Sequence, residues 1–217
     1  MLANYHGQPV TPEEIAAAIY LPDIHGTLTA DLANYAKRFN LWVRQYRGSQ
    51  ADLRQKFPSC SINAFAADLS QRESALAFGN WVIQQGAVPE VLVNNAGVFL
   101  PGSMMEEEEG QFENIMTTNM NSAYHMTRGL WSILKKSQRA HVFNMCSIAS
   151  ITAYAAGGSY SVSKFAMLGF SKSLRLEGLP HGIRVTAILP GATLTDSWAG
   201  VDLPSSRFMQ PNDVADV

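Results

Sequence analysis

The chain has 217 residues, of which 47% are hydrophobic and 16% are charged, a composition that suits one globular domain with a sizeable core. Its formal net charge of -2 gives no electrostatic reason to expect nucleic acid or an anionic membrane as a partner. Two cysteines without metal-like spacing, the absence of a signal-peptide pattern and of a membrane-length apolar run predict a soluble, cytoplasmic protein without a bound metal.

The first 40 residues are predicted to contain two helices. Residues 11–14 form a capping box with proline at the first helical position, which indicates a short helix through Ile19. Residues 26–40 carry apolar side chains at helical spacing and predict a second helix. Residues 1–25 form an atypical N-terminal segment of what we expect to be a single domain spanning residues 1–217.

From residue 41 onwards, short apolar runs alternate with helical patterns. Predicted strands occupy residues 41–47, 62–66, 91–93, 141–146 and 183–189, and predicted helices occupy residues 50–57, 70–86, 111–136 and 159–178. This alternation predicts an α/β fold, a doubly wound parallel sheet with helices on both faces. A capping box from Ser70 to Glu73 is expected to start the helix at 70–86, and Gly86 to end it. Its expected inward residues are Ala75, Phe78 and Val82.

The acidic run Glu106–Glu109 is expected to form the solvated first turn of the helix at 111–136, where carboxylates favour the helix dipole. Four consecutive carboxylates do not share one face of a helix, so a metal site is not expected there. The predicted buried residues of the helix are Phe112, Ile115, Leu130 and Leu134.

Acid–base chemistry is concentrated between residues 147 and 164. Tyr160 and Lys164 are four residues apart, so a helix places them on one face, one turn apart. A free phenol has a pKa near 10, and a nearby ammonium group lowers that pKa toward the working range. Ser147 precedes the helix and offers a hydroxyl to the same substrate oxygen. Taken alone, a Tyr-x-x-x-Lys pair is more often structural, so the case depends on its neighbours in the sequence.

Together, residues 94–97 (Asn-Asn-Ala-Gly), Asn119, Ser147, Tyr160, Lys164 and the pair Pro190-Gly191 resemble the short-chain dehydrogenase/reductase family, over residues 40–217. The resemblance implies a Rossmann-like fold and an oxidoreductase that interconverts a carbonyl and an alcohol. It assigns acid–base catalysis to Tyr160, polarisation of the carbonyl to Ser147 and lowering of the Tyr160 pKa to Lys164. Asn119 would distort its helix and complete a water relay to Lys164. Ser150 is the alternative to Ser147, and Asn121 the alternative to Asn119.

The resemblance also implies a cofactor, NADP(H) in preference to NAD(H). Arg47 ends the predicted strand at 41–47, which corresponds to the second strand of the family, and would there pair with the 2′-phosphate of NADP. A solvated arginine at a strand end is the alternative. Thr195 matches the residue that binds the nicotinamide carboxamide, and Asp68 and Leu69 would lie along the adenine. The full expected cofactor-binding set is Gly26, Arg47, Asp68, Leu69, Asn95, Ala96, Gly97, Tyr160, Lys164, Pro190, Gly191 and Thr195.

The sequence departs from the family pattern at both ends. Family members follow their first strand with Thr-Gly-x-x-x-Gly-x-Gly, and the matching stretch at 21–28 keeps only Gly26. Pro22 lacks an N–H, and Leu28 places a side chain where backbone must approach the pyrophosphate. The first strand and its loop are therefore expected to be altered. The last strand of the family is expected to be absent, because the sequence stops at Val217.

The leading hypothesis is an NADP(H)-dependent oxidoreductase that acts on a small carbonyl or alcohol, with residues 196–210 as a substrate flap. Family members suggest a homodimer or homotetramer. Two alternatives remain: a binding or scaffold protein that has lost its cofactor through the altered loop, and a cofactor-free lyase or isomerase that uses Tyr160. Direct titration with nicotinamide cofactors distinguishes these hypotheses.

Overall fold

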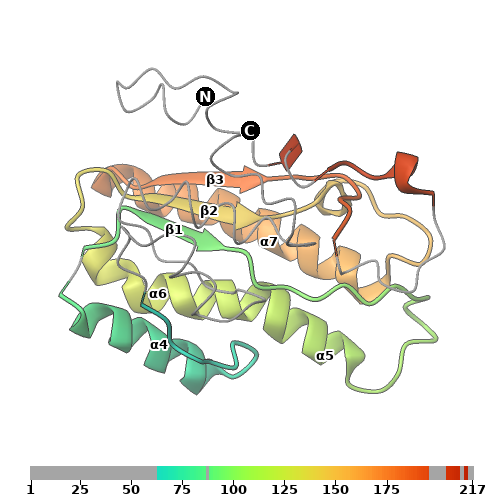
Figure 1. Cartoon of the computed structure of the whole chain (residues 1–217), viewed down its shortest axis with the longest axis horizontal. Coiled ribbons are helices and arrows are strands. Elements are labelled where there is room, and N and C mark those ends of the chain that lie inside the picture. Colours follow the sequence, from blue (N-terminus) through green and yellow to red (C-terminus); the bar gives the residue numbers. More distant parts are fainter. Residues whose placement is uncertain (1–62, 87, 196–203, 211–212, 215–217) are drawn as a thin grey trace.

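The computed structural model describes residues 63–86, 88–195, 204–210 and 213–214 (Figure 1). The helices expected at 11–19, 26–40 and 50–57, the strand at 41–47 and the altered loop at 21–28 lie outside the described residues. So do two members of the expected cofactor-binding set, Gly26 and Arg47, and most of the expected flap.

Three parallel strands form the described sheet, in the order β1-β2-β3. They are β1 (Val91–Asn94), β2 (His141–Met145) and β3 (Arg184–Ile188). Val93 pairs with Phe143, and Phe143 pairs with Thr186 on the other side. Every residue of β2 is buried, as expected for the central strand of a parallel sheet covered by helices. Because the strands are parallel, their carboxyl ends meet at one edge, where ligands bind in such sheets.

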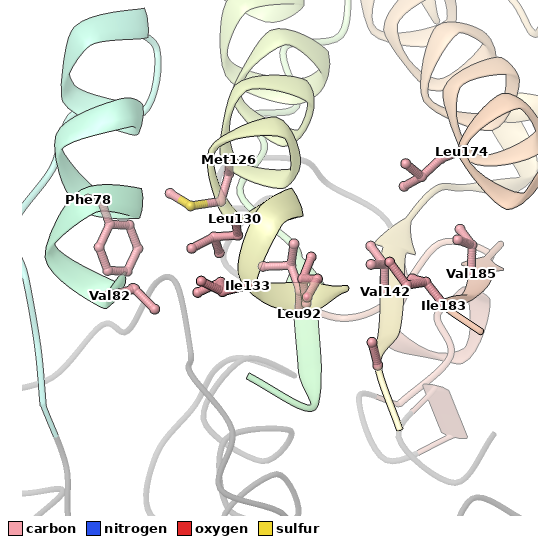
Figure 2. Close-up of a cluster of buried hydrophobic side chains, with 12 residues drawn as sticks. Phe78, Val82, Leu92, Met126, Leu130, Ile133, Val142, Leu174, Ile183 and Val185 are labelled. Carbon is pink, nitrogen blue, oxygen red and sulfur yellow. The ribbon is translucent and has the colours of Figure 1, made fainter. Parts of the chain in front are cut away.

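Three long helices cover one face of this sheet. They are α4 (Arg72–Gln84), α6 (Ser122–Leu134) and α7 (Gly158–Gly178). Figure 2 shows them side by side, with Phe78 and Val82 of α4 and Met126 and Leu130 of α6 lying between these two helices. The buried cluster between the layers contains Phe78, Val82, Leu92, Met126, Leu130, Ile133, Leu134, Ala140, Val142, Leu174, Ile183 and Val185. The parallel α/β sheet with flanking helices expected from the sequence is confirmed.

The start of α4 differs from the prediction. Its N-cap is Gln71, with no side-chain cap, so the capping box expected to begin at Ser70 is wrong. The Asp68 carboxylate accepts hydrogen bonds from the backbone N (3.0 Å) and the hydroxyl (2.7 Å) of Ser70. Ser70 therefore belongs to a tight turn that delays the helix by one residue. The expected end is confirmed, because Gly86 follows the helix with a φ of 72° that favours glycine.

The strand expected at 62–66 is also wrong for the described residues 63–66, which form no strand. A strand needs a hydrogen-bonded neighbour, and these residues have none within the described part of the chain. The apolar side chain of Phe65 is used differently. Its ring stacks on Phe78 at 5.6 Å and lies 5.4 Å from the ring of Trp81, so it extends the packing of α4.

The long helix expected at 111–136 is divided into three parts. It comprises α5 (Gln111–Met116), the π-helical segment η2 (Thr117–Asn121) and then α6. The local distortion expected at Asn119 is confirmed, since Asn119 lies within η2. Such wide turns are rare and frequently lie at functional sites. Ile115, Leu130 and Leu134 are buried as predicted, but Phe112 is 45% exposed because it lies on the outer side of a short first segment.

The acidic run before α5 is not helical. Residues 106–109 are irregular, with turns only at 106 and 109, and Gly110, in a left-handed conformation with φ of 84°, is the N-cap of α5. The expectation of a solvated first helical turn is therefore wrong. Glu106, Glu108 and Glu109 are exposed, but Glu107 is half-buried.

A chain of buried polar side chains connects β1, β2 and α7 inside the molecule. Asn94 Nδ2 donates to Asn144 Oδ1 (2.8 Å) and Thr127 Oγ1 (2.9 Å). Asn144 Nδ2 donates to Ser171 Oγ (2.9 Å), and this hydroxyl donates to the backbone oxygen of Met167 (2.7 Å). Buried polar groups need such partners, and here each is supplied by a neighbouring element.

Short helical turns complete the described structure: η3 (Ile148–Ser150), η4 (Leu179–His181) and η6 (Ser205–Arg207). Among the described residues, no helix is both long and apolar enough to cross a bilayer. The expected flap at 196–210 is described only from residue 204, and Val214 beyond it packs against Met145 and Ile188.

Candidate active site

Ser147, Tyr160 and Lys164 come together where β2 ends and α7 begins. Ser147 lies two residues after the last residue of β2, and Tyr160 is the third residue of α7. The hydroxyl of Ser147 forms a hydrogen bond with the Tyr160 phenol, and Lys164 Nζ lies 5.5 Å from the centroid of the Tyr160 ring. The shared helix face expected for Tyr160 and Lys164 is present.

Local hydrogen bonds fix the position of Ser147. Its backbone is extended, and it caps η3 by accepting a hydrogen bond at Oγ from the Ala149 backbone N (3.1 Å). The Ser150 hydroxyl in turn accepts from the backbone N of Ser147 (3.1 Å). Ser150 is 1% exposed and holds the backbone of Ser147, so the geometry favours Ser147 as the hydroxyl that meets a substrate.

The environment of Tyr160 keeps its phenol protonated. Burial raises the pKa of Tyr160 to about 12, and the hydrogen bond from Ser147 only partly opposes this shift. The ring of Phe99 packs edge-on against it, with centroids 4.8 Å apart. Removal from water is the largest effect on this pKa, and the lowering expected from Lys164 stays a prediction.

Lys164 is buried in the same region and is affected by the same lack of water. Its side chain is 7% exposed, and burial lowers the pKa of Lys164 to about 8. Nζ donates a hydrogen bond to the backbone oxygen of Met145 at 2.8 Å. An ammonium group has three donors, and this hydrogen bond orients the group while leaving donors for a ligand.

Asn119 connects the loop after β1 to α7. Its Oδ1 accepts from the backbone N of Val98 (2.7 Å), and Nδ2 donates to the Val98 oxygen (3.0 Å) and to Ser163 Oγ (3.0 Å). The Ser163 hydroxyl donates to the backbone oxygen of Tyr160 (2.7 Å). Asn119 is fully buried, whereas Asn121 is exposed, so the geometry selects Asn119. The water relay to Lys164 stays a prediction.

Several expected cofactor residues lie at the carboxyl edge of the sheet. Asn95, Ala96 and Gly97 directly follow β1, and Pro190 and Gly191 follow β3. Gly97 packs closely on the site, because a Cβ atom there would lie 3.3 Å from Asn119 Oδ1. The remaining expected members within the described residues are Asp68, Leu69 and Thr195.

The backbone of η3 is tied to the end of β3, since Ile148 N donates to the Pro190 oxygen at 2.9 Å. The contacts that the structure gives for Asp68 and Leu69 are with other parts of the molecule. The Asp68 carboxylate accepts from Ser70, and Leu69 packs against the core cluster. Their expected place along the adenine stays a prediction.

The donors present suit the nicotinamide half of a dinucleotide. Lys164 offers an oriented ammonium group, Tyr160 a protonated phenol, and the two strand ends offer small residues at which a flat ring can approach the backbone. The residues expected to hold the phosphates, at 21–28, lie outside the described part. No three His, Cys, Asp or Glu side chains among the described residues are grouped to hold a metal ion.

One contact at this site was not predicted from the sequence. The Glu107 carboxylate accepts hydrogen bonds from the backbone N of Ser159 (2.7 Å) and from the Ser159 hydroxyl, directly before Tyr160. Nothing in a run of four glutamates distinguishes the second one. Only the positive φ required at Gly110 and Gly158 gives a reason for the chain to fold this way, and φ is not visible in a sequence.

Comparisons with known proteins agree with this geometry. Residues 36–204 match the family model described as short chain dehydrogenase. Sepiapterin reductase of Chlorobaculum tepidum is 28% identical over 154 residues, 70% of this chain and 63% of that protein. A 3alpha-hydroxysteroid dehydrogenase of Mediterraneibacter gnavus is 29% identical over 189 residues, 81% of this chain and 76% of that protein.

The fold is shared with a solved alcohol dehydrogenase from the archaeon Thermococcus sibiricus complexed with 5-hydroxy-NADP. That structure has a TM-score of 0.69 at 21% identity and covers 76% of this chain and 70% of its own. The chain thus spans less than two thirds of the length of the sepiapterin reductase and about three quarters of the length of the steroid dehydrogenase.

Proposed function

The chain belongs to the short-chain dehydrogenase family, and on that basis we propose that it is an NADP(H)-dependent oxidoreductase that interconverts a small carbonyl compound and its alcohol. The observation that carries the proposal is the contact between Ser147 and Tyr160, with the Lys164 ammonium 5.5 Å from the Tyr160 ring. Two hydroxyls that meet at one point can both reach the oxygen of a carbonyl group.

In the reducing direction, the Ser147 hydroxyl donates a hydrogen bond to the substrate oxygen and polarises the carbonyl. Tyr160 then gives its phenolic proton to that oxygen as the alcohol forms. The raised pKa of Tyr160, about 12, keeps this proton in place at neutral pH. A bound nicotinamide cofactor supplies the hydride in this direction and accepts it in the reverse.

Lys164 orients the site and carries positive charge close to the phenol. Its hydrogen bond to Met145 fixes the ammonium at the end of β2, from where it can also bind the ribose of the cofactor. A cation near the Tyr160 oxygen favours the phenolate that remains after proton transfer. Asn119 holds the first turn of α7 through Ser163, so Tyr160 keeps its direction toward Ser147.

The preference for NADP(H) is proposed from Arg47, with NAD(H) as the weaker ligand. A guanidinium pairs with a 2′-phosphate at two points, which a hydroxyl cannot match. The solved alcohol dehydrogenase that shares this fold is described as a complex with 5-hydroxy-NADP, in keeping with a nicotinamide cofactor. By the same family argument, the protein is expected to act as a homodimer or homotetramer.

Titration of the purified chain with NADPH and NADH tests the proposal, with nicotinamide fluorescence as the readout. We expect micromolar binding of NADPH and weaker binding of NADH, and Arg47→Glu should remove the difference. Tyr160→Phe is the matched control, since it keeps the ring but removes the phenolic proton, so it should still bind cofactor but fail to reduce any carbonyl in a substrate panel. If neither cofactor binds, the oxidoreductase proposal is wrong for this chain, and a binding protein or a cofactor-free Tyr160 enzyme becomes the better account.

A further inference from the structure

The loop between β1 and α5 contacts the start of the catalytic helix α7 at three points. The ring of Phe99 packs against Tyr160 with centroids 4.8 Å apart. Gly102 N donates to the backbone oxygen of Ala156 at 3.0 Å. The Glu107 carboxylate accepts from both the backbone N and the hydroxyl of Ser159. The contacts fall just before α7 and within its first turn.

Glu107 supplies what the start of α7 lacks. The first amides of a helix have no partner within the helix, and the N-cap of α7 is Gly157, which has no side chain to offer. A carboxylate from a segment 52 residues earlier takes that place. The negative charge is favoured at this position by the helix dipole, and a charged acceptor makes a stronger hydrogen bond than a neutral one.

The backbone around this contact is shaped to admit the carboxylate. Gly158 has a φ of +42°, and a Cβ atom there would collide with Glu107 Oε1 and lie 2.8 Å from the Gly102 oxygen. A residue with a side chain at 158 would therefore push Glu107 away from Ser159. The glycine is required both by its conformation and by the approach of the carboxylate.

Burial makes Glu107 different from its neighbours. Glu106, Glu108 and Glu109 are exposed, while Glu107 is half-buried between the loop and α7. Among the described residues, its carboxylate contacts no lysine or arginine side chain at ion-pair distance. Its partner is the residue that immediately precedes Tyr160, so a shift of Ser159 moves the catalytic phenol with it.

We propose that Glu107 is a positioning residue that anchors the first turn of α7 through Ser159 and so holds Tyr160 against Ser147. This inference rests on the proposed oxidoreductase function and names a residue that controls the alignment of its acid. Loss of alignment by about 1 Å costs up to about a hundredfold in rate, which sets the size of the expected effect.

Four variants test the proposal: Glu107→Ala, Glu107→Gln, Ser159→Ala and the control Glu106→Ala, which removes the same charge from the exposed neighbour. We expect Glu107→Ala to lower kcat by about 10- to 100-fold with little change in KM for the cofactor. Glu107→Gln keeps an oxygen for the Ser159 amide and should restore kcat to within about threefold of wild type, with Ser159→Ala between these two. Glu106→Ala should match wild type.

A second readout does not depend on turnover. Tyrosinate absorbance near 295 nm is recorded against pH for each variant with and without Tyr160→Phe, and the difference isolates the ionisation of Tyr160. Release of the first turn lets water reach the phenol, so the pKa of Tyr160 should fall toward its ordinary value in Glu107→Ala and stay unchanged in Glu106→Ala. If Glu107→Ala does not fold, the Glu107→Gln and Ser159→Ala pair carries the same comparison.

The two readouts separate failure of this inference from failure of the proposed function. If wild type shows no turnover but the tyrosinate titration shifts only in the Glu107 and Ser159 variants, the positioning role holds and the oxidoreductase proposal is wrong. If Glu107→Ala equals Glu106→Ala in both kcat and the Tyr160 titration, Glu107 does not position the phenol. A loss of stability without either change would make it a structural contact only and would also overturn the proposal.

Discussion

Lys164 and Met145 are joined by a 2.8 Å hydrogen bond from the ammonium to the backbone oxygen, which ties the catalytic helix to the end of the central strand. The bond orients a cation that is almost completely removed from water. The site thus holds a destabilised charge beside a phenol that resists ionisation, and the first two predictions follow from this pair.

The first prediction concerns the pH dependence of folding. Because the pKa of Lys164 is about 8 in the folded chain and 10.5 is its ordinary value, the unfolded state binds more protons between these pH values. The contribution of Lys164 to the free energy of unfolding therefore rises with pH over that window. Below pH 8 the full cost of burying its charge applies. We expect wild type to gain about 3 kcal/mol relative to Lys164→Met between pH 7 and pH 10.5.

Urea unfolding of both proteins at several pH values across this window provides the measurement. Lys172→Met, which removes an exposed lysine from the same helix, is the matched control and should run parallel to wild type. Lys172→Met keeps Lys164, Tyr160 and Cys146, so the titrations of these groups cancel in its comparison with wild type. Parallel curves for wild type and Lys164→Met would show that the ammonium carries no burial penalty.

The second prediction concerns activity against pH. With the pKa of Tyr160 at about 12, its phenol stays protonated through pH 10, so ionisation of Tyr160 does not limit carbonyl reduction there. We expect kcat/KM for reduction to fall above about pH 8 as Lys164 loses its charge, because its pKa lies there. Tyrosinate absorbance measured on the same samples should show no ionisation of Tyr160 at the pH where activity is lost. Ionisation of Tyr160 below pH 9 would contradict the assignment of the activity loss to Lys164.

The third prediction separates two asparagines in η2. Asn119→Ala removes three hydrogen bonds that join Val98 to Ser163 and takes the side-chain partner from the part-buried backbone N and O of Val98. We expect a loss of about 2–4 kcal/mol in the free energy of unfolding, together with a lower kcat. Asn121→Ala, on the exposed side of the same segment, should change stability by less than about 0.5 kcal/mol. Equal effects in chemical denaturation would show that burial of Asn119 is not what matters.

The fourth prediction is a stabilising substitution. The Ser161 hydroxyl is buried and has no hydrogen-bond partner among the described residues. Ser161→Ala removes this unsatisfied group and introduces a better helix former, so we expect about 1–2 kcal/mol of added stability. Ser173→Ala, exposed on the same helix, supplies the helix-propensity part alone, about 0.5 kcal/mol. The melting temperatures of the two variants measure the difference, and a Ser161→Ala value no higher than the control contradicts the prediction.

Long apolar patterns and fixed spacings were readable from the sequence. Val91–Val93 form most of β1, which is buried from Leu92 onwards, and the four-residue spacing of Tyr160 and Lys164 placed both on one face of α7. These features depend on local periodicity, which the sequence contains directly. Spacing also favoured Asn119 over Asn121, and the structure adds the reason: Asn119 is buried within η2 and Asn121 is exposed.

Other features depend on contacts between distant segments and could not be read locally. Ser70 matches the pattern of a capping box, but its hydroxyl donates a hydrogen bond to the Asp68 carboxylate instead of capping α4. Glu107 lies among identical neighbours, and only the approach of the β1–α5 loop to Ser159 selects it. The pKa of Tyr160 depends on how many atoms surround the phenol, which spacing from Lys164 does not reveal.

The buried amides of Asn94 and Asn144 have a consequence for how the sheet assembles. A slip of one residue between neighbouring strands moves every side chain to the opposite face, so side chains that must stay buried together specify the register. Here a slip of one position would break the 2.8 Å hydrogen bond between the two amides, at a cost of about 1–3 kcal/mol. The pair therefore acts as an alignment mark between β1 and β2. The hydrogen bond between Asn94 and Asn144 destabilises other registers of β1 and β2. The carboxyl ends of the two strands, which carry the site, therefore lie at a fixed position relative to each other.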